Sequence, residues 1–175
     1  MKLCLAFHCL CESYDRLPES GRDLFVSLDD MAQMIEEISR RGYRFSGLED
    51  QSSKTMTITF DDGYHNNLLF KDLAQRFQIP YLVFISSYYA QSGQGFPWLE
   101  VDGATYEGMH DFDYYQHFAH AENGANEIQE VPVPATDEQR PMNFHELKEL
   151  LSDGLSEIGC HGYYHQPLSQ QYQHR

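Results

Sequence analysis

Strand-like and helix-like segments alternate along this chain, and no other feature of the sequence constrains its fold as strongly. Apolar or β-branched runs typical of buried strands occupy residues 3–9, 55–60, 81–85 and 155–160. Amphipathic stretches typical of helices lie in the three intervals, around residues 28–41, 69–77 and 144–153. Such a β/α succession predicts an α/β fold with a mainly parallel sheet or a barrel.

Local signals set the ends of the predicted helices. Ser27 and Asp30 resemble a capping box with Asp in place of Glu, and Gly42 stops the first helix after a basic last turn. Asn143 and Glu146 give the third helix a capping box, and an Asp-Gly pair ends it. We therefore expect one domain over residues 1–175.

The periodicity fails between residues 91 and 140. This stretch is rich in glycine, proline, acidic residues and aromatic residues, among them Trp98. A structureless loop of this length is unusual in a compact domain, which favours a functional insertion such as a lid or a substrate wall. A surface excursion without a function is the alternative.

The acidic composition excludes one broad class of function. The chain has 12 Lys and Arg against 27 Asp and Glu, a formal net charge of −15. Nucleic-acid binding needs clustered basic side chains, so we expect no nucleic-acid partner. No apolar run approaches the ~20 residues that a membrane-spanning helix needs, so we expect no membrane span.

The N-terminus and the cysteines bear on the compartment. Residues 1–7 resemble a short signal peptide, but charged residues follow where a small-residue cleavage site would be needed. We interpret them as a buried strand and expect a cytoplasmic protein. The four cysteines, at positions 4, 9, 11 and 160, form no CxxC motif. Two disulfides are arithmetically possible, but buried free thiols are the simpler expectation.

Two polar motifs follow predicted strands. Residues 59–64 read Thr-Phe-Asp-Asp-Gly-Tyr, and residues 161–165 read His-Gly-Tyr-Tyr-His. Adjacent carboxylates at a strand end are costly unless a cation or a proton donor uses them. Asp62 with His161 and His165 would give a three-ligand site of oxygen and nitrogen donors with room for water, the pattern of catalytic zinc.

These two motifs together resemble those of the polysaccharide deacetylase family, also called the NodB-homology family of carbohydrate esterases. The resemblance extends to residues 6–8, 41–43, 79–84 and 144–161, and so covers most of the chain outside the insertion. It implies a distorted (β/α) barrel, or the N-terminal portion of one. It also implies hydrolysis of N-acetyl groups on an amino-sugar glycan, with release of acetate.

The resemblance assigns roles to individual residues. Asp62, His161 and His165 would hold a divalent metal, most simply zinc, and Asp61 would be the catalytic base that accepts a proton from the attacking water. The bound metal would polarise the acetyl carbonyl and make the water more acidic.

Three further residues are candidates for contact with the carbohydrate substrate. Tyr64 follows the paired carboxylates, His8 lies near the end of the first strand, and Trp98 could stack on a sugar ring. His8 could instead be a core histidine, and Trp98 could instead hold the insertion to the body of the domain.

The sequence departs from the family pattern in three places. Gly162 stands where the family usually has Ser or Thr, the 91–140 insertion lengthens the spacing between the motifs, and the family's later motifs do not occur before Arg175. We therefore expect a truncated domain that self-associates or belongs to a longer polypeptide. Two alternative functions follow: a weak or inactive domain that retains metal and glycan, and a metal-dependent hydrolase of a non-sugar amide.

Overall fold

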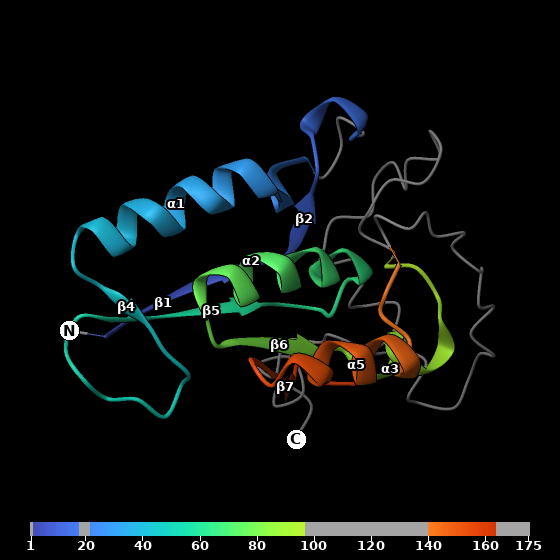
Figure 1. Ribbon diagram of the computed structural model, residues 1–175. Helices are drawn as coiled ribbons and strands as arrows, with labels where there is room; N and C mark the ends of the chain where they lie inside the picture. The colour runs from blue at the N-terminus through green and yellow to red at the C-terminus, as the bar shows by residue number, and fades with distance from the viewer. Residues whose placement is uncertain (1, 18–21, 97–139, 164–175) are drawn as a thin grey trace, which may run out of the picture.

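The computed structural model describes residues 2–17, 22–96 and 140–163 (Figure 1). The strands are β1 (Lys2–Phe7), β2 (Cys9–Cys11), β3 (Phe25–Ser27), β4 (Arg44–Phe45), β5 (Thr55–Phe60), β6 (Tyr81–Ile85) and β7 (Ser156–Cys160). The α-helices are α1 (Leu28–Arg40), α2 (Phe70–Phe77), α3 (Ser87–Ser92) and α5 (Phe144–Leu150). The 3-10 turns are η1 (Tyr14–Arg16), η2 (Arg22–Leu24), η3 (His65–Leu69) and η4 (Leu151–Asp153).

Five strands form one parallel sheet in the order β1-β5-β6-β7, with β4 beside β5. β1 pairs with β5 along its whole length, from Lys2 opposite Thr55 to Phe7 opposite Phe60. The other edge of β5 is shared, because β4 pairs with its first two residues and β6 with its last three. Since every strand runs the same way, the carboxyl ends of β1, β5, β6 and β7 lie at one edge of the sheet.

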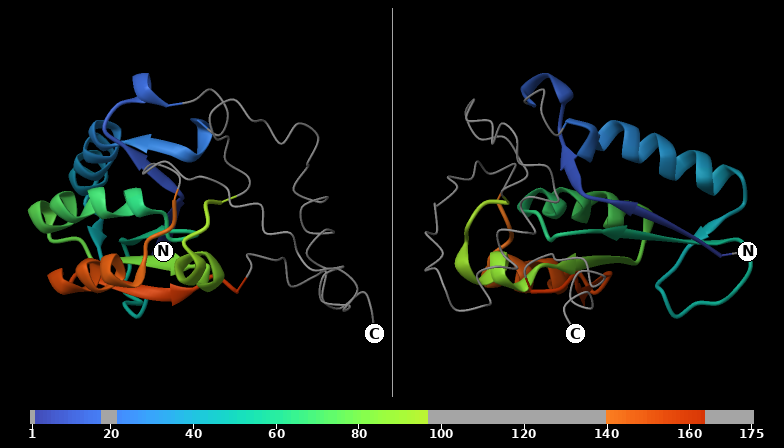
Figure 2. Two further views of the ribbon diagram at one scale, coloured as in Figure 1. Left: turned by 90° about the vertical axis from the view of Figure 1, so that its right-hand side faces the viewer. Right: turned by 180° about the vertical axis from the view of Figure 1, so that it is seen from behind.

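The helices α1, α2 and α5 cover one face of this sheet (Figures 1 and 2). The main core fills the space between them, with fully buried Met31 and Ile35 from α1, Phe70 from α2, and Ile58 and Phe60 from β5. All six residues of β5 are buried, which fits its place in the middle of the sheet. A two-stranded sheet of β2 and β3 lies beside this body.

The predicted α/β fold is confirmed. The predicted strands at 55–60 and 81–85 have the observed bounds, and the fourth is one residue shorter than predicted. The first predicted strand is divided at His8 into β1 and β2. Within the described residues the sheet does not close on itself, so a complete barrel remains a prediction.

The helix caps are largely as predicted. The capping box of Asn143 and Glu146 is complete at α5. At α1, Ser27 accepts the Asp30 amide, but the Asp30 carboxylate accepts the Ser27 hydroxyl at 2.8 Å instead of the Ser27 amide. That amide donates to the Tyr14 hydroxyl at 3.1 Å. The shorter Asp side chain thus leaves half of the box to a tyrosine from η1.

The expectation of four buried thiols is wrong for two of them. All four cysteines are free, with Cys9 and Cys11 buried but Cys4 and Cys160 exposed. Cys4 and Cys160 lie on β1 and β7, the outermost strands of the described sheet, where one side of the strand lacks a neighbour. In the described part of the chain, no helix has the length and apolar character to cross a membrane. Most of the predicted insertion, residues 97–139, lies outside the described residues.

The close packing of β6 against β7 gives a test of the fold. Gly159 lies opposite Phe84, and a Cβ atom at Gly159 would lie 2.5 Å from Cδ1 of the Phe84 ring. We expect Gly159→Ala to lower the free energy of unfolding by ~1–3 kcal/mol, because the ring must leave its rotamer. Urea denaturation followed by circular dichroism measures the change.

Gly47→Ala is the matched control for this substitution. The nearest atom to a Cβ at Gly47 is a Glu157 carboxylate oxygen at 3.7 Å, an ordinary contact. Its unfolding free energy should therefore stay within ~1 kcal/mol of the parent protein. Equal stability of the two alanine variants would contradict the observed register of β6 and β7.

Candidate active site

The parallel sheet delivers four polar residues to one edge. His8 follows β1, Asp61 follows β5, Ser86 follows β6 and His161 follows β7. The carboxyl edge of a parallel sheet is where active sites of α/β proteins gather, because the loops there diverge and leave space. The first motif, residues 59–64, and the described part of the second, residues 161–163, thus meet at the edge where chemistry is expected.

A tight turn after β5 orients the two aspartates. The Asp61 amide donates to the Phe7 carbonyl at 2.8 Å, and the Gly63 amide returns to the Asp61 carbonyl at 2.9 Å. Asp62 and Gly63 both adopt left-handed backbone conformations, with φ of 71° and 84°. A Cβ at Gly63 would lie 2.6 Å from the Ile85 side chain, so the turn needs glycine for both conformation and space.

The turn sends the two carboxylates into different surroundings. Asp62 is only 2% exposed, whereas Asp61 is partly exposed. The Asp62 carbonyl accepts the Ser86 amide at 3.2 Å, which fixes the residue against the end of β6. One carboxylate is therefore fixed inside the edge while the other can meet a ligand from solvent.

His161 approaches the buried carboxylate from β7. Its Nε2 lies 3.4 Å from Oδ1 of Asp62, and its ring is 30% exposed. The His161 amide donates to the Ile85 carbonyl at 2.9 Å, which continues the β6–β7 pairing by one residue. The structure therefore brings together two of the three residues that the sequence predicts as metal ligands.

This pair fits a tetrahedral metal. Bonds of ~2.0–2.1 Å at a tetrahedral angle place two ligand atoms about 3.3 Å apart, close to the observed 3.4 Å. Carboxylate oxygen and imidazole nitrogen are also donors that zinc accepts. No cluster of three or more His, Cys, Asp or Glu suited to a metal is found among the described residues. The third predicted ligand, His165, lies outside them.

A buried amide pair, which the sequence analysis missed, holds the β1–β2 junction against this turn. Asn67 Nδ2 donates to the His8 carbonyl at 2.7 Å, and Asn66 Oδ1 accepts the Leu10 amide at 2.9 Å. Both asparagines are at most 4% exposed. Their only sequence signal is two consecutive amides shortly after the paired carboxylates. They fix the backbone at the His8 carbonyl and at Leu10, and the His8 side chain is partly exposed.

Cys9, beside this pair, is not a nucleophile or ligand. Burial raises the pKa of its thiol strongly, a hydrogen bond with Asn66 partly opposes this, and the charge of Asp62 adds to the rise. A thiol in such surroundings stays protonated near neutral pH and is chemically inert.

An ionic cluster, which the sequence analysis also missed, lies on the other side of the turn at residues 61–63. Arg140 forms a two-point contact with Glu146, at 2.9 and 2.7 Å, and His65 Nδ1 lies 3.1 Å from the same carboxylate. The backbone joins in, because the His65 amide donates to the Arg140 carbonyl and the Met142 amide to the Gly63 carbonyl, each at 2.9 Å. The chain that enters α5 is thereby fixed to the aspartate turn.

The three residues predicted to contact the substrate lie in different surroundings or outside the described residues. Tyr64 is fully buried, with its ring centroid 4.4 Å from that of Phe96. It therefore packs in the core beside the turn, and its predicted contact with substrate stays a prediction. Trp98 lies outside the described residues. His8 lies at the correct edge, directly after β1.

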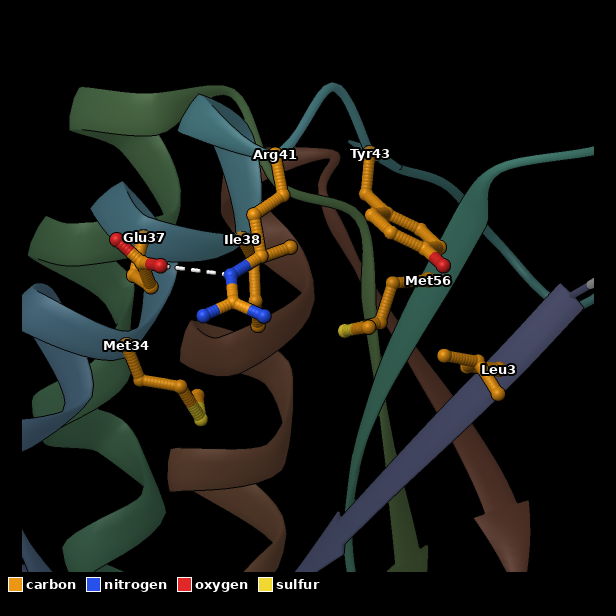
Figure 3. Close-up of a pocket in the computed structure, with 7 residues that line it drawn as sticks. All are labelled: Leu3, Met34, Glu37, Ile38, Arg41, Tyr43 and Met56. Carbon is orange, nitrogen blue, oxygen red and sulfur yellow. Dashed lines mark hydrogen bonds and ion pairs between the residues drawn. The ribbon is translucent and has the colours of Figure 1, made fainter.

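A hollow of about 310 Å³ lies elsewhere, between α1 and the amino-terminal halves of β1 and β5 (Figure 3). Leu3, Met56, Met34 and Tyr43 are among its lining residues. Met56 precedes Phe60, the last residue of β5, by four positions, which separates the hollow from the carboxyl edge by ~13 Å along the strand. The hollow is therefore separate from the candidate site.

Comparison with known proteins supports the fold. No protein-family model and no curated protein matches the sequence. The structure is similar to that of a de-N-acetylase from Aggregatibacter actinomycetemcomitans, with a TM-score of 0.58 and 13% identity over 91% of this chain and 54% of that one. It also matches the BpsB deacetylase domain from Bordetella bronchiseptica, with a TM-score of 0.47 and 18% identity over 91% and 53%.

The first of these similarities shows the fold. This chain spans about half the length of either solved structure, 54% and 53%. The α/β fold predicted from the alternation of strands and helices is therefore similar to the fold of a de-N-acetylase structure.

The ionic cluster predicts how stability depends on pH. The Arg140 guanidinium lowers the pKa of Glu146 from 4.5 to about 2, against the opposing effect of burial. A lowered pKa stabilises the folded state fully above pH ~4.5, and this contribution is lost as the pH falls toward 2. We expect Glu146→Gln to lose at most ~3 kcal/mol at pH 6 and much less at pH 2.5.

Urea unfolding of both proteins between pH 2.5 and 6 measures this. Glu149→Gln on the same helix is the control, because Glu149 is 54% exposed and its ion pair with Lys71 spans 3.7 Å. Exposed pairs of this kind contribute little, so its effect should be small at every pH. A constant difference between Glu146→Gln and the parent protein would contradict the depressed pKa.

Proposed function

We propose that this protein is a metal-dependent deacetylase that removes N-acetyl groups from an amino-sugar glycan and releases acetate. The observation that supports this most directly is the 3.4 Å approach of Asp62 and His161. It lies beside a second, more accessible carboxylate at the carboxyl edge of a sheet with the fold of a de-N-acetylase structure. Metal dependence, the substrate and the roles of single residues are parts of this proposal.

Asp62, His161 and His165 are the residues proposed to hold the metal, most simply zinc. A bound zinc ion would act as a Lewis acid toward the acetyl carbonyl and would lower the pKa of a bound water. The buried position of Asp62 suits a ligand, because a fixed carboxylate in a water-poor site loses little freedom on binding a cation. Its partner His161 is held by backbone pairing to β6, so both donors are placed before a metal arrives.

Asp61 is proposed as the general base. Its backbone is fixed by the hydrogen bond to Phe7, while its carboxylate is more accessible than that of Asp62. It would accept a proton from the water that attacks the N-acetyl carbonyl.

His8 is the candidate for the opposite proton transfer. The leaving amine must gain a proton when the amide C–N bond breaks, and imidazole is the side chain that most often supplies one near neutral pH. His8 follows the residue whose carbonyl holds the Asp61 amide, and Asn67 holds its own carbonyl. Aspartate and histidine thus extend from adjacent strands on the same edge.

Metal content gives the first test. We expect about one divalent ion per chain in protein purified without chelators, because the site has one set of donors. His161→Ala and Asp62→Asn should each lose most of it, since each removes or weakens one of three proposed ligands. Elemental analysis reads this directly, with Glu157→Gln on β7 as the control. Full metal retention by both site variants would rule out the proposed ligands.

Substitution of the proposed base, Asp61, should affect the rate of acetate release but not the metal content. Asp61→Asn should keep its metal but lower the rate of acetate release from chitooligosaccharides by ~10²–10⁴-fold, because an amide cannot accept the proton of water. His8→Gln should also keep its metal, and should flatten the alkaline side of the pH–rate profile if His8 is the acid.

The parent protein decides the reaction class. Acetate release that stops with chelator and returns with zinc is the expected result. No acetate from any N-acetylated oligomer, by a metal-loaded chain, would overturn the proposed reaction. Loss of metal from Asp61→Asn and retention in Asp62→Asn would reverse the roles of the two aspartates.

A further inference from the structure

An exposed aromatic pair lies at the rim of the candidate site. Tyr163 follows His161 by two residues and is 50% exposed, one of the most exposed large hydrophobic side chains among the described residues. Its ring packs edge-on against Tyr88, with centroids 5.7 Å apart and planes at 70°. Tyr88 is itself partly exposed and packs edge-on against buried Tyr89, at 5.3 Å and 84°.

The pair is fixed in place by the backbone. The Ser87 amide donates to the Gly162 carbonyl at 3.2 Å, and the Tyr88 amide to the Tyr163 carbonyl at 3.0 Å. With the bond from the His161 amide to Ile85, these contacts extend the β6–β7 pairing past the strand ends. The backbone of Tyr163 is therefore held at a set position relative to His161, and the contact with Tyr88 places its ring.

An exposed ring so constrained needs an explanation. Half of the Tyr163 side chain lies in water, where its ring forfeits hydrophobic stabilisation. A rigid, exposed aromatic ring next to a polar site is, however, suited to an apolar ligand face. A pyranose ring presents such a face, because its axial C–H bonds form an apolar patch while its hydroxyl groups point outward.

We propose that Tyr163, supported by Tyr88, is a stacking platform for a sugar ring adjacent to the residue whose acetyl group is removed. This rests on the proposed function and extends it, because it assigns a second sugar subsite and makes the substrate an oligosaccharide. The platform lies beside His161, so a ring on Tyr163 and an acetyl group at the metal would belong to neighbouring sugar units. Affinity should then rise between one and two or more sugar units.

Binding without turnover tests the platform. The Asp61→Asn variant, which should not hydrolyse the ligand, is titrated with N-acetylglucosamine and with chitooligosaccharides of two to five units. On this background we expect Tyr163→Ala to weaken oligomer binding by about 10-fold and to leave monomer binding nearly unchanged. Tyr163→Phe should bind like the parent background, because stacking needs the ring and not the hydroxyl.

Two controls separate this from a structural effect. Metal content must be equal in all variants, since loss of His161 geometry would lower it. Tyr43→Ala, which removes a tyrosine at the opposite end of the sheet, should leave oligomer affinity unchanged. Equal affinity of Tyr163→Ala and the background for every oligomer would overturn the platform, as would no measurable oligomer binding.

The experiments distinguish failure of the proposed reaction from failure of the proposed platform. If the parent protein releases no acetate but the Asp61→Asn background binds oligomers through Tyr163, the subsite stands and the chain is a glycan-binding domain. If the parent protein releases acetate and Tyr163→Ala has unchanged KM for all chain lengths, the reaction stands and the platform is wrong.

Discussion

The candidate site depends on how the turn at residues 61–63 is anchored to the strands on either side. The Asp61 amide bonds to the end of β1, and the Asp62 carbonyl accepts an amide from the end of β6. Two consecutive left-handed residues, at φ of 71° and 84°, are needed to make both bonds. The non-glycine one of these costs ~1 kcal/mol or more, comparable to one hydrogen bond. The two backbone hydrogen bonds thus offset the cost of the left-handed conformation. That conformation directs the two carboxylates to different surroundings.

Burial of Asp62 has an electrostatic consequence for what the edge can bind. Moving a carboxylate out of water costs several kcal/mol unless a cation or a hydrogen-bond donor compensates. His161 Nε2 lies 3.4 Å from this carboxylate, and a metal ion shared by the two side chains would supply such a cation. The whole chain carries a formal charge of −15, which would repel a polyanionic glycan. An N-acetylated sugar chain is uncharged and meets no such penalty.

The sequence predicted the parts of this structure that depend on short-range pattern. The β-branched run at 55–60 and the apolar run at 81–85 gave the bounds of β5 and β6, because buried central strands admit few other residues. Asn143 and Glu146 gave the start of α5, because both halves of a capping box lie within four residues. The placement of Asp61, Asp62 and His161 at one edge followed from the parallel sheet.

The missed features all depend on contacts between distant segments. Asn67 lies between a predicted strand and a predicted helix, and its role depends on the His8 carbonyl, 59 positions earlier, which accepts its side-chain amide. Arg140 and Glu146 are close in the sequence, so their pairing is local. The contact of Glu146 with His65, which lies far away in the sequence, is what ties this pair to the aspartate turn. The exposure of Cys4 and Cys160 depends on which strands end the sheet, and strand order is not encoded in the character of either segment.

The contact between Asp62 and His161 shows why the motifs alone could not give the distance between the two side chains. They follow β5 and β7, which are not neighbours, because β6 lies between them. Two interstrand spacings amount to ~10 Å, yet the two side-chain atoms are 3.4 Å apart. The turn carries the Asp62 backbone to the end of β6, where the Asp62 carbonyl accepts the Ser86 amide at 3.2 Å. The geometry of the pair therefore depends, through this backbone bond, on Ser86, a residue outside both motifs.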